Sequence, residues 1–154
     1  MGLIRTDTLN YNSDPVAAIN NVNNTKTIYS SGSVVKNGID ETLVGLWKYH
    51  DAKTNADSYY KFLADGTFEY YTSTVTEANK MKGINRWKIE GIGYDEDGGV
   101  IDLTWAGAAS VLREGIAKKN DPVTGKPAIV FILNGTAMLI SADNKVPWKQ
   151  NELN

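Results

Sequence analysis

The sequence contains no cysteine, which excludes disulfides, thiolate metal sites and cysteine nucleophiles. The absence of cysteine also fits a reducing compartment. There is only one histidine, His50, so an imidazole-based metal cluster would need help from carboxylates. We expect His50 to be a solvated residue at the end of a strand, with a role as a ligand or general base as the alternative.

An excess of charge of one sign is also missing. Sixteen Lys and Arg stand against 18 Asp and Glu, and the net charge of -2 gives no electrostatic reason to expect nucleic acid or a membrane as a partner. The chain has neither an apolar run of membrane-spanning length nor a signal-peptide pattern at its start. We therefore expect a cytoplasmic location, or one within an assembled particle, unless a leader was removed.

Catalytic and cofactor motifs are lacking as well. No phosphate-binding loop string occurs, and the run Asp95-Glu96-Asp97 is followed at once by two glycines instead of the spacing of a calcium loop. We interpret this run as an acidic hairpin tip and predict no metal, no cofactor and no catalytic residue. The protein is expected not to be an enzyme; an active site inside the barrel, using Tyr70, Arg113 or Glu114, is the alternative.

Apolar residues are sparse over residues 1–40, which are rich in Asn and Ser. Such a segment cannot bury enough apolar surface by itself to offset the entropy lost on ordering. We predict an extended N-terminal arm over residues 1–40, with a short helix capped by Asp14, and a single domain over residues 41–154.

The rest of the chain is a succession of short strand patterns separated by turn residues. The predicted strands cover residues 43–50, 58–63, 67–75, 85–94, 99–105, 110–118, 127–133 and 136–141. Sequential strands joined by hairpins can close into an up-and-down barrel, which leaves no edge exposed. The expected fold class is all-β: a small antiparallel barrel of about eight strands with an extended N-terminal arm. Residues 106–119 fit either a helix or a strand, and the barrel count favours a strand.

Two turns define predicted hairpins. Asn134-Gly135 is the strongest short hairpin signal in the chain. Asp65 and Gly66 lie in the turn of the other hairpin, Ser58–Thr74, where a three-residue loop with Gly66 in the left-handed conformation places aromatic residues together on one face. The pairs expected from that register are Phe62 with Phe68, Tyr60 with Tyr70, and Lys61 with Glu69.

The segment Leu43–Tyr49, with Gly45 and Trp47 in a G-x-W pattern, resembles the first strand of the lipocalin and calycin group. Residues 60–68 are similar to the second hairpin of bacterial lipocalin-like domains, and the resemblance extends over about 43–148. It implies a closed barrel in which Trp47 closes one end, packed against a basic side chain such as Arg86 or Arg113. In that group the G-x-W strand has a structural role.

Aromatic residues dominate the predicted inner face of the barrel. They are Tyr60, Phe62, Phe68, Tyr70, Trp87 and Trp105. They either fill the core or line a cavity for one small apolar or planar ligand. Since Arg113 and Glu114 are neighbours in the sixth predicted strand, one of the two should point inward. We expect an outward-facing or end-capping charge, with a group inside a pocket as the alternative, and Arg113 is a candidate ligand contact if a cavity exists.

These observations lead to two hypotheses about function. The first is a non-enzymatic structural or interaction protein, a subunit of a multi-copy assembly such as a virion component. Its partners would be copies of itself or neighbouring subunits, contacted through residues 1–40. The second is a lipocalin-like protein that binds a small hydrophobic ligand inside the barrel.

Overall fold

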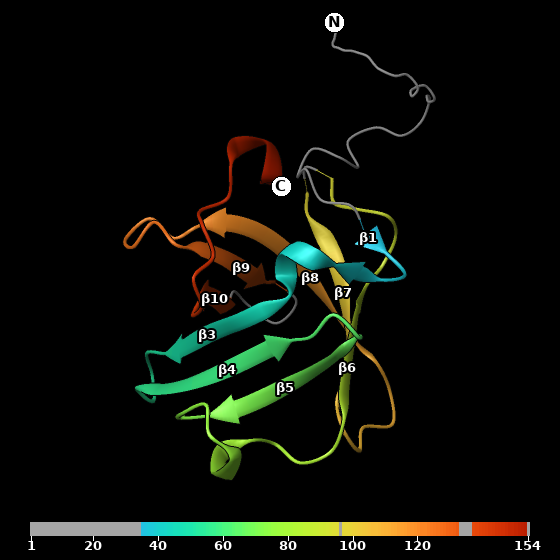
Figure 1. Ribbon diagram of the computed structural model, residues 1–154, viewed down its shortest axis with the longest axis vertical. Helices are drawn as coiled ribbons and strands as arrows, with labels where there is room; N and C mark the ends of the chain where they lie inside the picture. Colours follow the sequence, from blue (N-terminus) through green and yellow to red (C-terminus); the bar gives the residue numbers. More distant parts are fainter. Residues whose placement is uncertain (1–34, 96, 133–136, 154) are drawn as a thin grey trace, which may run out of the picture.

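The protein is a closed antiparallel β-barrel of eight strands, seen in a computed structural model that describes residues 35–95, 97–132 and 137–153 (Figure 1). The strands are β3 (Gly45–Asp51), β4 (Ala56–Phe62), β5 (Thr67–Thr72), β6 (Asn85–Ile89), β7 (Gly99–Thr104), β8 (Leu112–Asn120), β9 (Pro127–Phe131) and β10 (Ala137–Ser141). Each strand pairs with the next in the sequence, and β10 pairs with β3 to close the barrel. The predicted all-β up-and-down barrel is therefore confirmed.

Each predicted strand overlaps one observed strand, including the ambiguous sixth one. Residues 112–120 form β8, which pairs with β7 on one side and β9 on the other. The strand prediction over 106–119 is thus confirmed at its C-terminal half. The backbone N–H and C=O groups of β8 bond to the strands on both sides. In a helix these groups would bond within the helix and could not join the sheet.

The β4–β5 hairpin has the predicted register. Phe62 pairs with Phe68, and the same ladder brings together Tyr60 with Tyr70 and Lys61 with Glu69. The turn is held by the Asp65 carboxylate, which accepts a hydrogen bond of 2.9 Å from the Thr67 N–H, and Gly66 has a φ of +88°. A left-handed residue at this point places the aromatic side chains of both strands on the inner face.

A small second sheet lies against the barrel. It consists of β1 (Val35–Lys36) and β2 (Ile39–Asp40), and it leads through a 3-10 turn, η1 (Glu41–Leu43), into β3. The Ile89 N–H donates a hydrogen bond of 2.7 Å to the Gly38 carbonyl. β5 and β6 share only two paired positions, at the start of β6. At the end of β6, this hydrogen bond joins the strand to the small hairpin instead. We call residues 35–40 the stem.

Two short 3-10 turns complete the described elements: η2 (Glu77–Asn79), in the loop between β5 and β6, and η3 (Gln150–Glu152), near the C-terminus. In Figure 1 the stem and the C-terminal segment both lie toward the upper end of the barrel. No helical element among the described residues is long and apolar enough to cross a membrane. The Asn134-Gly135 turn, residues 1–34 and Glu96 are outside the described residues.

The barrel surrounds one core built from alternate residues of every strand. β6 shows the pattern most clearly, because Asn85, Trp87 and Ile89 are buried while Arg86 and Lys88 are exposed. Val35 from the stem and Trp148 from the C-terminal segment belong to the same core cluster. The sequence pattern predicted residues 35–40 to be part of the N-terminal arm. In the structure these residues pack against the barrel.

Candidate functional site

The predicted inner aromatic residues do come together, and Tyr60 lies at their centre. Its ring centroid is 5.2 to 6.0 Å from five other aromatic rings. These are the rings of Phe62, Phe68, Tyr70, Trp105 and Phe131. Trp87 joins the cluster through Phe62, with a centroid distance of 5.0 Å. The shared inner face is confirmed, and a ligand-binding role for these residues stays a prediction.

Burial of the inner face changes from one end of the barrel to the other. Trp47 and Phe62 are 0% exposed and Phe68 is 2% exposed. Tyr60 and Tyr70, which share the inner face with them, are only half-buried. The inner side chains are therefore fully buried at the Trp47 end of the barrel and partly exposed at the other end. We call the partly exposed end the mouth.

Arg113 and Glu114 point to opposite sides of β8. Glu114 is buried on the inner face, whereas the Arg113 side chain is 66% exposed and donates two hydrogen bonds of 2.7 Å to the Glu90 carboxylate. Arg113 is therefore not a contact inside the barrel, the alternative that the sequence left open, since strand alternation turns Glu114 inward instead. The sequence left open which of the two residues points inward.

The inner tyrosine hydroxyls and Glu114 influence one another electrostatically. Burial raises the pKa of Tyr60 well above its usual value, and nearby Tyr70, Glu114 and Tyr49 raise it further because each would repel a phenolate. Tyr60 therefore stays protonated at neutral pH and can donate a hydrogen bond. The mouth of the barrel thus combines aromatic rings, hydroxyl groups and a carboxylic side chain.

Trp47 closes the sealed end of the barrel. Its indole N–H donates to the Leu43 carbonyl at 2.9 Å, and its ring stacks on Trp148 at a centroid distance of 6.3 Å. The basic group near this ring is Lys145, whose Nζ is 5.9 Å from the ring centroid and donates to the Val44 carbonyl at 2.6 Å. The expectation that Arg86 or Arg113 packs here is wrong.

The reason for Gly45 at the start of this strand is also visible. It has a φ of +141°, and a Cβ atom there would collide with the Asp143 carboxylate and the end of Lys145. The Asp143 carboxylate accepts a hydrogen bond of 3.0 Å from the Leu46 N–H. The glycine therefore allows the C-terminal segment to close over the first barrel strand.

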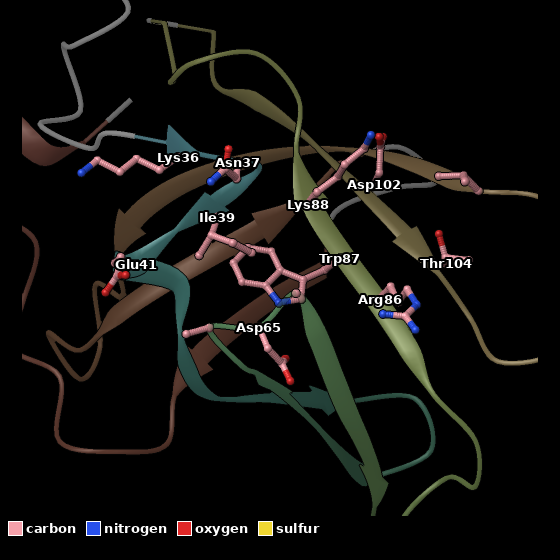
Figure 2. A pocket seen from close by; sticks show the side chains of 13 residues that line it. Lys36, Asn37, Ile39, Glu41, Asp65, Arg86, Trp87, Lys88, Asp102 and Thr104 are labelled. Atoms are coloured by element: carbon pink, nitrogen blue, oxygen red, sulfur yellow. The ribbon is translucent and has the colours of Figure 1, made fainter.

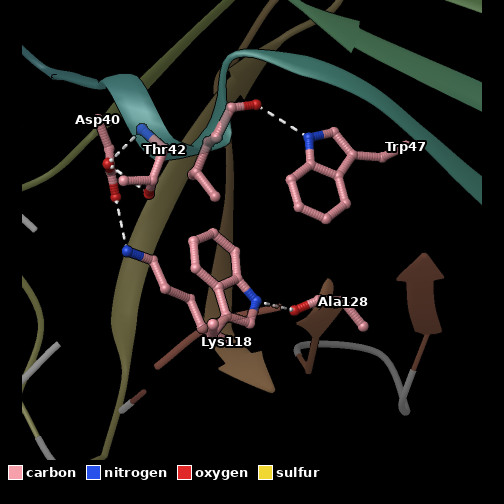
Figure 3. A network of polar contacts seen from close by, with 7 residues as sticks. Asp40, Thr42, Trp47, Lys118 and Ala128 are labelled. Carbon is pink, nitrogen blue, oxygen red and sulfur yellow. Dashed lines mark hydrogen bonds and ion pairs between the residues drawn. The ribbon is translucent and has the colours of Figure 1, made fainter. Parts of the chain in front are cut away.

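A buried ion pair lies beside the sealed end (Figure 3). The Lys118 ammonium is 3.2 Å from Asp40, and the two side chains are 0% and 1% exposed. The other Asp40 oxygen accepts hydrogen bonds from the N–H and the hydroxyl of Thr42, at 3.0 and 2.7 Å. The ammonium also lies 4.5 Å from the Tyr94 ring centroid and 5.0 Å from that of Trp148. Burial lowers the pKa of Lys118, and Asp40 opposes this shift.

The outer surface has a groove of about 940 Å³ beside the stem (Figure 2). It lies between the stem, the β4–β5 turn and the outer face of β6 and β7. Six of its lining residues are charged, with equal numbers of each sign: Lys36, Arg86, Lys88, Glu41, Asp65 and Asp102. Ile39 and the exposed Val111 add apolar surface. The groove exists because the stem folds back onto β6, which strand patterns did not predict.

His50 lies near the end of β3 on the outer face, with a side chain 50% exposed. Its Nδ1 is 2.7 Å from the Asp57 carboxylate, and this hydrogen bond lowers the pKa of Asp57. Across the described ranges, no three His, Asp or Glu side chains are placed to hold a metal ion. The expectation of a solvated strand-end histidine agrees with this position.

The fold and its two different ends define the class of protein: an eight-stranded, all-antiparallel closed barrel, compatible with a calycin-like fold. Comparison of the chain with protein-family models, with curated proteins and with solved structures finds no match in any of the three.

Proposed function

We propose that the protein is a non-enzymatic interaction protein, a subunit of a multi-copy assembly held together partly by its N-terminal arm. The observation that carries this proposal is the position of the stem. Residues 35–40 are fixed to the barrel through Val35 in the core, the Gly38 hydrogen bond and the Asp40 ion pair. The sequence that precedes Val35 is therefore attached at a rigid point, beside the charged groove.

The groove suits a protein partner. Its three cationic and three anionic side chains balance, so it offers no net attraction for a polyanion such as nucleic acid. Charges of both signs next to Ile39 and Val111 complement the mixture of polar and apolar groups that a polypeptide presents. An arm of 34 residues has a maximal reach of roughly 110 Å, enough to cross to a neighbouring barrel.

The test is the solution mass, measured by light scattering, of the full chain and of a variant lacking residues 1–34. We expect a defined oligomer for the full chain and a folded monomer for the shortened one. A second variant, Arg86→Glu, reverses a charge in the groove and should weaken the oligomer, while Lys53→Glu on the exposed β3–β4 loop should not. A full chain that remains monomeric at high concentration contradicts the proposal.

A second candidate function is a lipocalin-like protein that binds a small ligand at the mouth of the barrel. We propose it because the inward residues there are half-buried while those of the other end are sealed. Trp47 closing one end beside a cationic Lys145 further supports a calycin relationship. Titration with an apolar dye, followed by tryptophan fluorescence, tests the candidate. Trp105 at the mouth should respond, and a Trp105→Phe variant should lose that response.

A further inference from the structure

We propose that a groove on the outer face of β10, β3 and β4 binds the loop between β6 and β7 of a second copy of this chain. The inference rests on the proposed function, because it names a contact between subunits of the assembly in addition to the N-terminal arm. Three features support it: the apolar outer face of these strands, the charges of the groove, and the composition of the β6–β7 loop.

The outer face of the barrel is apolar where β10, β3 and β4 meet. A groove of about 590 Å³ lies there, and we call it the β3 groove. Its half-buried apolar lining residues are Leu46, Tyr59, Met138 and Ile140. The outward positions of β6, by contrast, are the exposed charged residues Arg86 and Lys88. An antiparallel sheet with one face on the core normally has a polar outer face, so an apolar one indicates a surface that a partner covers.

The charge of the β3 groove is positive. Within the described ranges, its ionisable lining residues are Lys48, His50 and Lys126, and none is acidic. Asp57 lies beside it, with its carboxylate 2.7 Å from His50 Nδ1 but 3.6 Å from Lys48 Nζ. Because an exposed ion pair contributes little, Lys48 remains able to bind another carboxylate.

The β6–β7 loop has the complementary character. Its sequence, residues 90–98, contains acidic residues and no basic one. Asp95 and Asp97 are exposed, and the Asp97 N–H donates a hydrogen bond of 2.9 Å to the Asp95 carboxylate. Ile92 in the same loop is 56% exposed. An apolar side chain near exposed carboxylates matches a groove with an apolar lining and two lysines.

The two surfaces lie on opposite sides of the barrel. In the order of strands around the barrel β3 is four positions from β7, the largest separation in a ring of eight (Figure 1). The contact therefore joins two copies head to tail, which builds rings or filaments. A twofold contact between two β3 grooves would instead bring the lysines of both copies together. One loop in one groove is small beside the roughly 1,200 Å² of a stable interface, so the contact acts together with the arm.

A cross-link tests the position of the contact. The chain has no cysteine, so Met138→Cys gives the β3 groove a single thiol for a benzophenone label. The labelled full chain is mixed with an isotopically heavy full chain, illuminated and analysed by mass spectrometry. We expect cross-links to residues 90–98 of the heavy copy, and none to these residues from a label at the exposed Lys53→Cys. Cross-links only to other segments, residues 1–34 included, or none between assembled copies, would overturn the inference.

Charge reversal tests the chemistry of the contact. Asp95→Lys with Asp97→Lys, the loop variant, should weaken association of the full chain at least about tenfold in sedimentation equilibrium, because it places like charges together. Adding Lys48→Glu and Lys126→Glu to the loop variant should restore association. Adding Lys53→Glu and Lys82→Glu on exposed loops restores the net charge equally but should not restore association. Equal restoration by both additions, or by neither, would overturn the inference; thermal unfolding confirms that each variant is folded.

The unchanged full chain separates this inference from the proposed function. If that chain forms no oligomer, the proposed function fails and the inference fails with it. If it assembles and the loop variant assembles equally well, only the contact between the β6–β7 loop and the β3 groove is refuted.

Discussion

The buried ammonium group of Lys118 lies among groups that attract a cation. Asp40 supplies the counter-ion, and the rings of Tyr94 and Trp148 flank the ammonium. An ion pair of this kind stabilises little compared with well-packed apolar residues, but removing one partner leaves a buried charge without compensation. The interaction therefore fixes the position of the stem more than it adds to stability.

We predict that Asp40→Asn lowers the free energy of unfolding by about 3–5 kcal/mol, because it leaves the Lys118 ammonium buried beside a neutral group. The double variant Asp40→Asn with Lys118→Met removes both charges and should recover part of that loss. Lys119→Met, at the exposed neighbouring position, is the control and should change stability by less than about 0.5 kcal/mol. Urea denaturation measures all three; equal effects for the single and double variants would contradict the buried-pair interpretation.

Tyr71 makes stability depend on alkaline pH. Burial and its hydrogen bond to Glu69 raise the pKa of Tyr71 from 10.0 to about 12. Between these values the folded state holds a proton that the unfolded state has lost, so stability falls as the pH rises from 10 to 12. We expect this group to account for a loss on the order of 2 kcal/mol, and Tyr71→Phe to make the loss smaller. Urea denaturation at pH 9 and pH 11.5 measures the difference; an unchanged pH dependence in the variant would contradict it.

At the level of elements, the β4–β5 hairpin was predictable in detail because all its information is local. Asp65 and Gly66 specify the turn, and aromatic residues at alternate positions on both strands specify the register. A shift of one residue would move every aromatic side chain to the outer face. The stem was not predictable in this way, because strands of two residues carry no periodicity. The stem is held by a hydrogen bond from the Ile89 N–H to the Gly38 carbonyl, between residues far apart in the sequence.

Gly66 provides a test of the turn. A Cβ atom at this position would have only ordinary contacts, 3.8 Å from Ile39 Cδ1 and from the Trp87 carbonyl, so a substitution there is affected mainly by the φ of +88°. We predict that Gly66→Ala costs about 1–2 kcal/mol of stability, and that Gly66→Asn costs less because Asn tolerates the left-handed region. Chemical denaturation compares the two variants; an Asn variant less stable than the Ala variant would show that another effect dominates.

On the scale of the whole molecule, the inner side chains of the barrel are fully buried at one end and partly exposed at the other. The sealed end depends on segments outside the barrel strands: η1, the stem and the C-terminal residues around Trp148. The predicted domain boundary falls after residue 40, so it separates Asp40 from the barrel, to which Asp40 is joined by its ion pair with Lys118. Removing the stem should therefore affect the barrel itself.

We predict that a chain lacking residues 1–34 unfolds at nearly the temperature of the full chain, while one lacking residues 1–40 unfolds about 10 °C or more below it. The second truncation removes Asp40 and Val35, leaving Lys118 buried without its counter-ion and a gap in the core. Circular dichroism during heating measures both. Equal unfolding temperatures for the two truncated chains would mean that the stem is dispensable and that the barrel begins after it.

The sequence by itself determined the eight strands, their order and the aromatic inner face, because turn residues and the alternation of side chains are encoded over a few neighbouring positions. Only the tertiary structure decided which end is sealed, which cation packs on Trp47 and which of Arg113 and Glu114 enters the barrel. It also formed the groove and the Asp40–Lys118 pair, whose members are 78 positions apart. These features depend on the stagger of strands around a closed barrel and on segments that fold over its end, so no local pattern in the sequence specifies them.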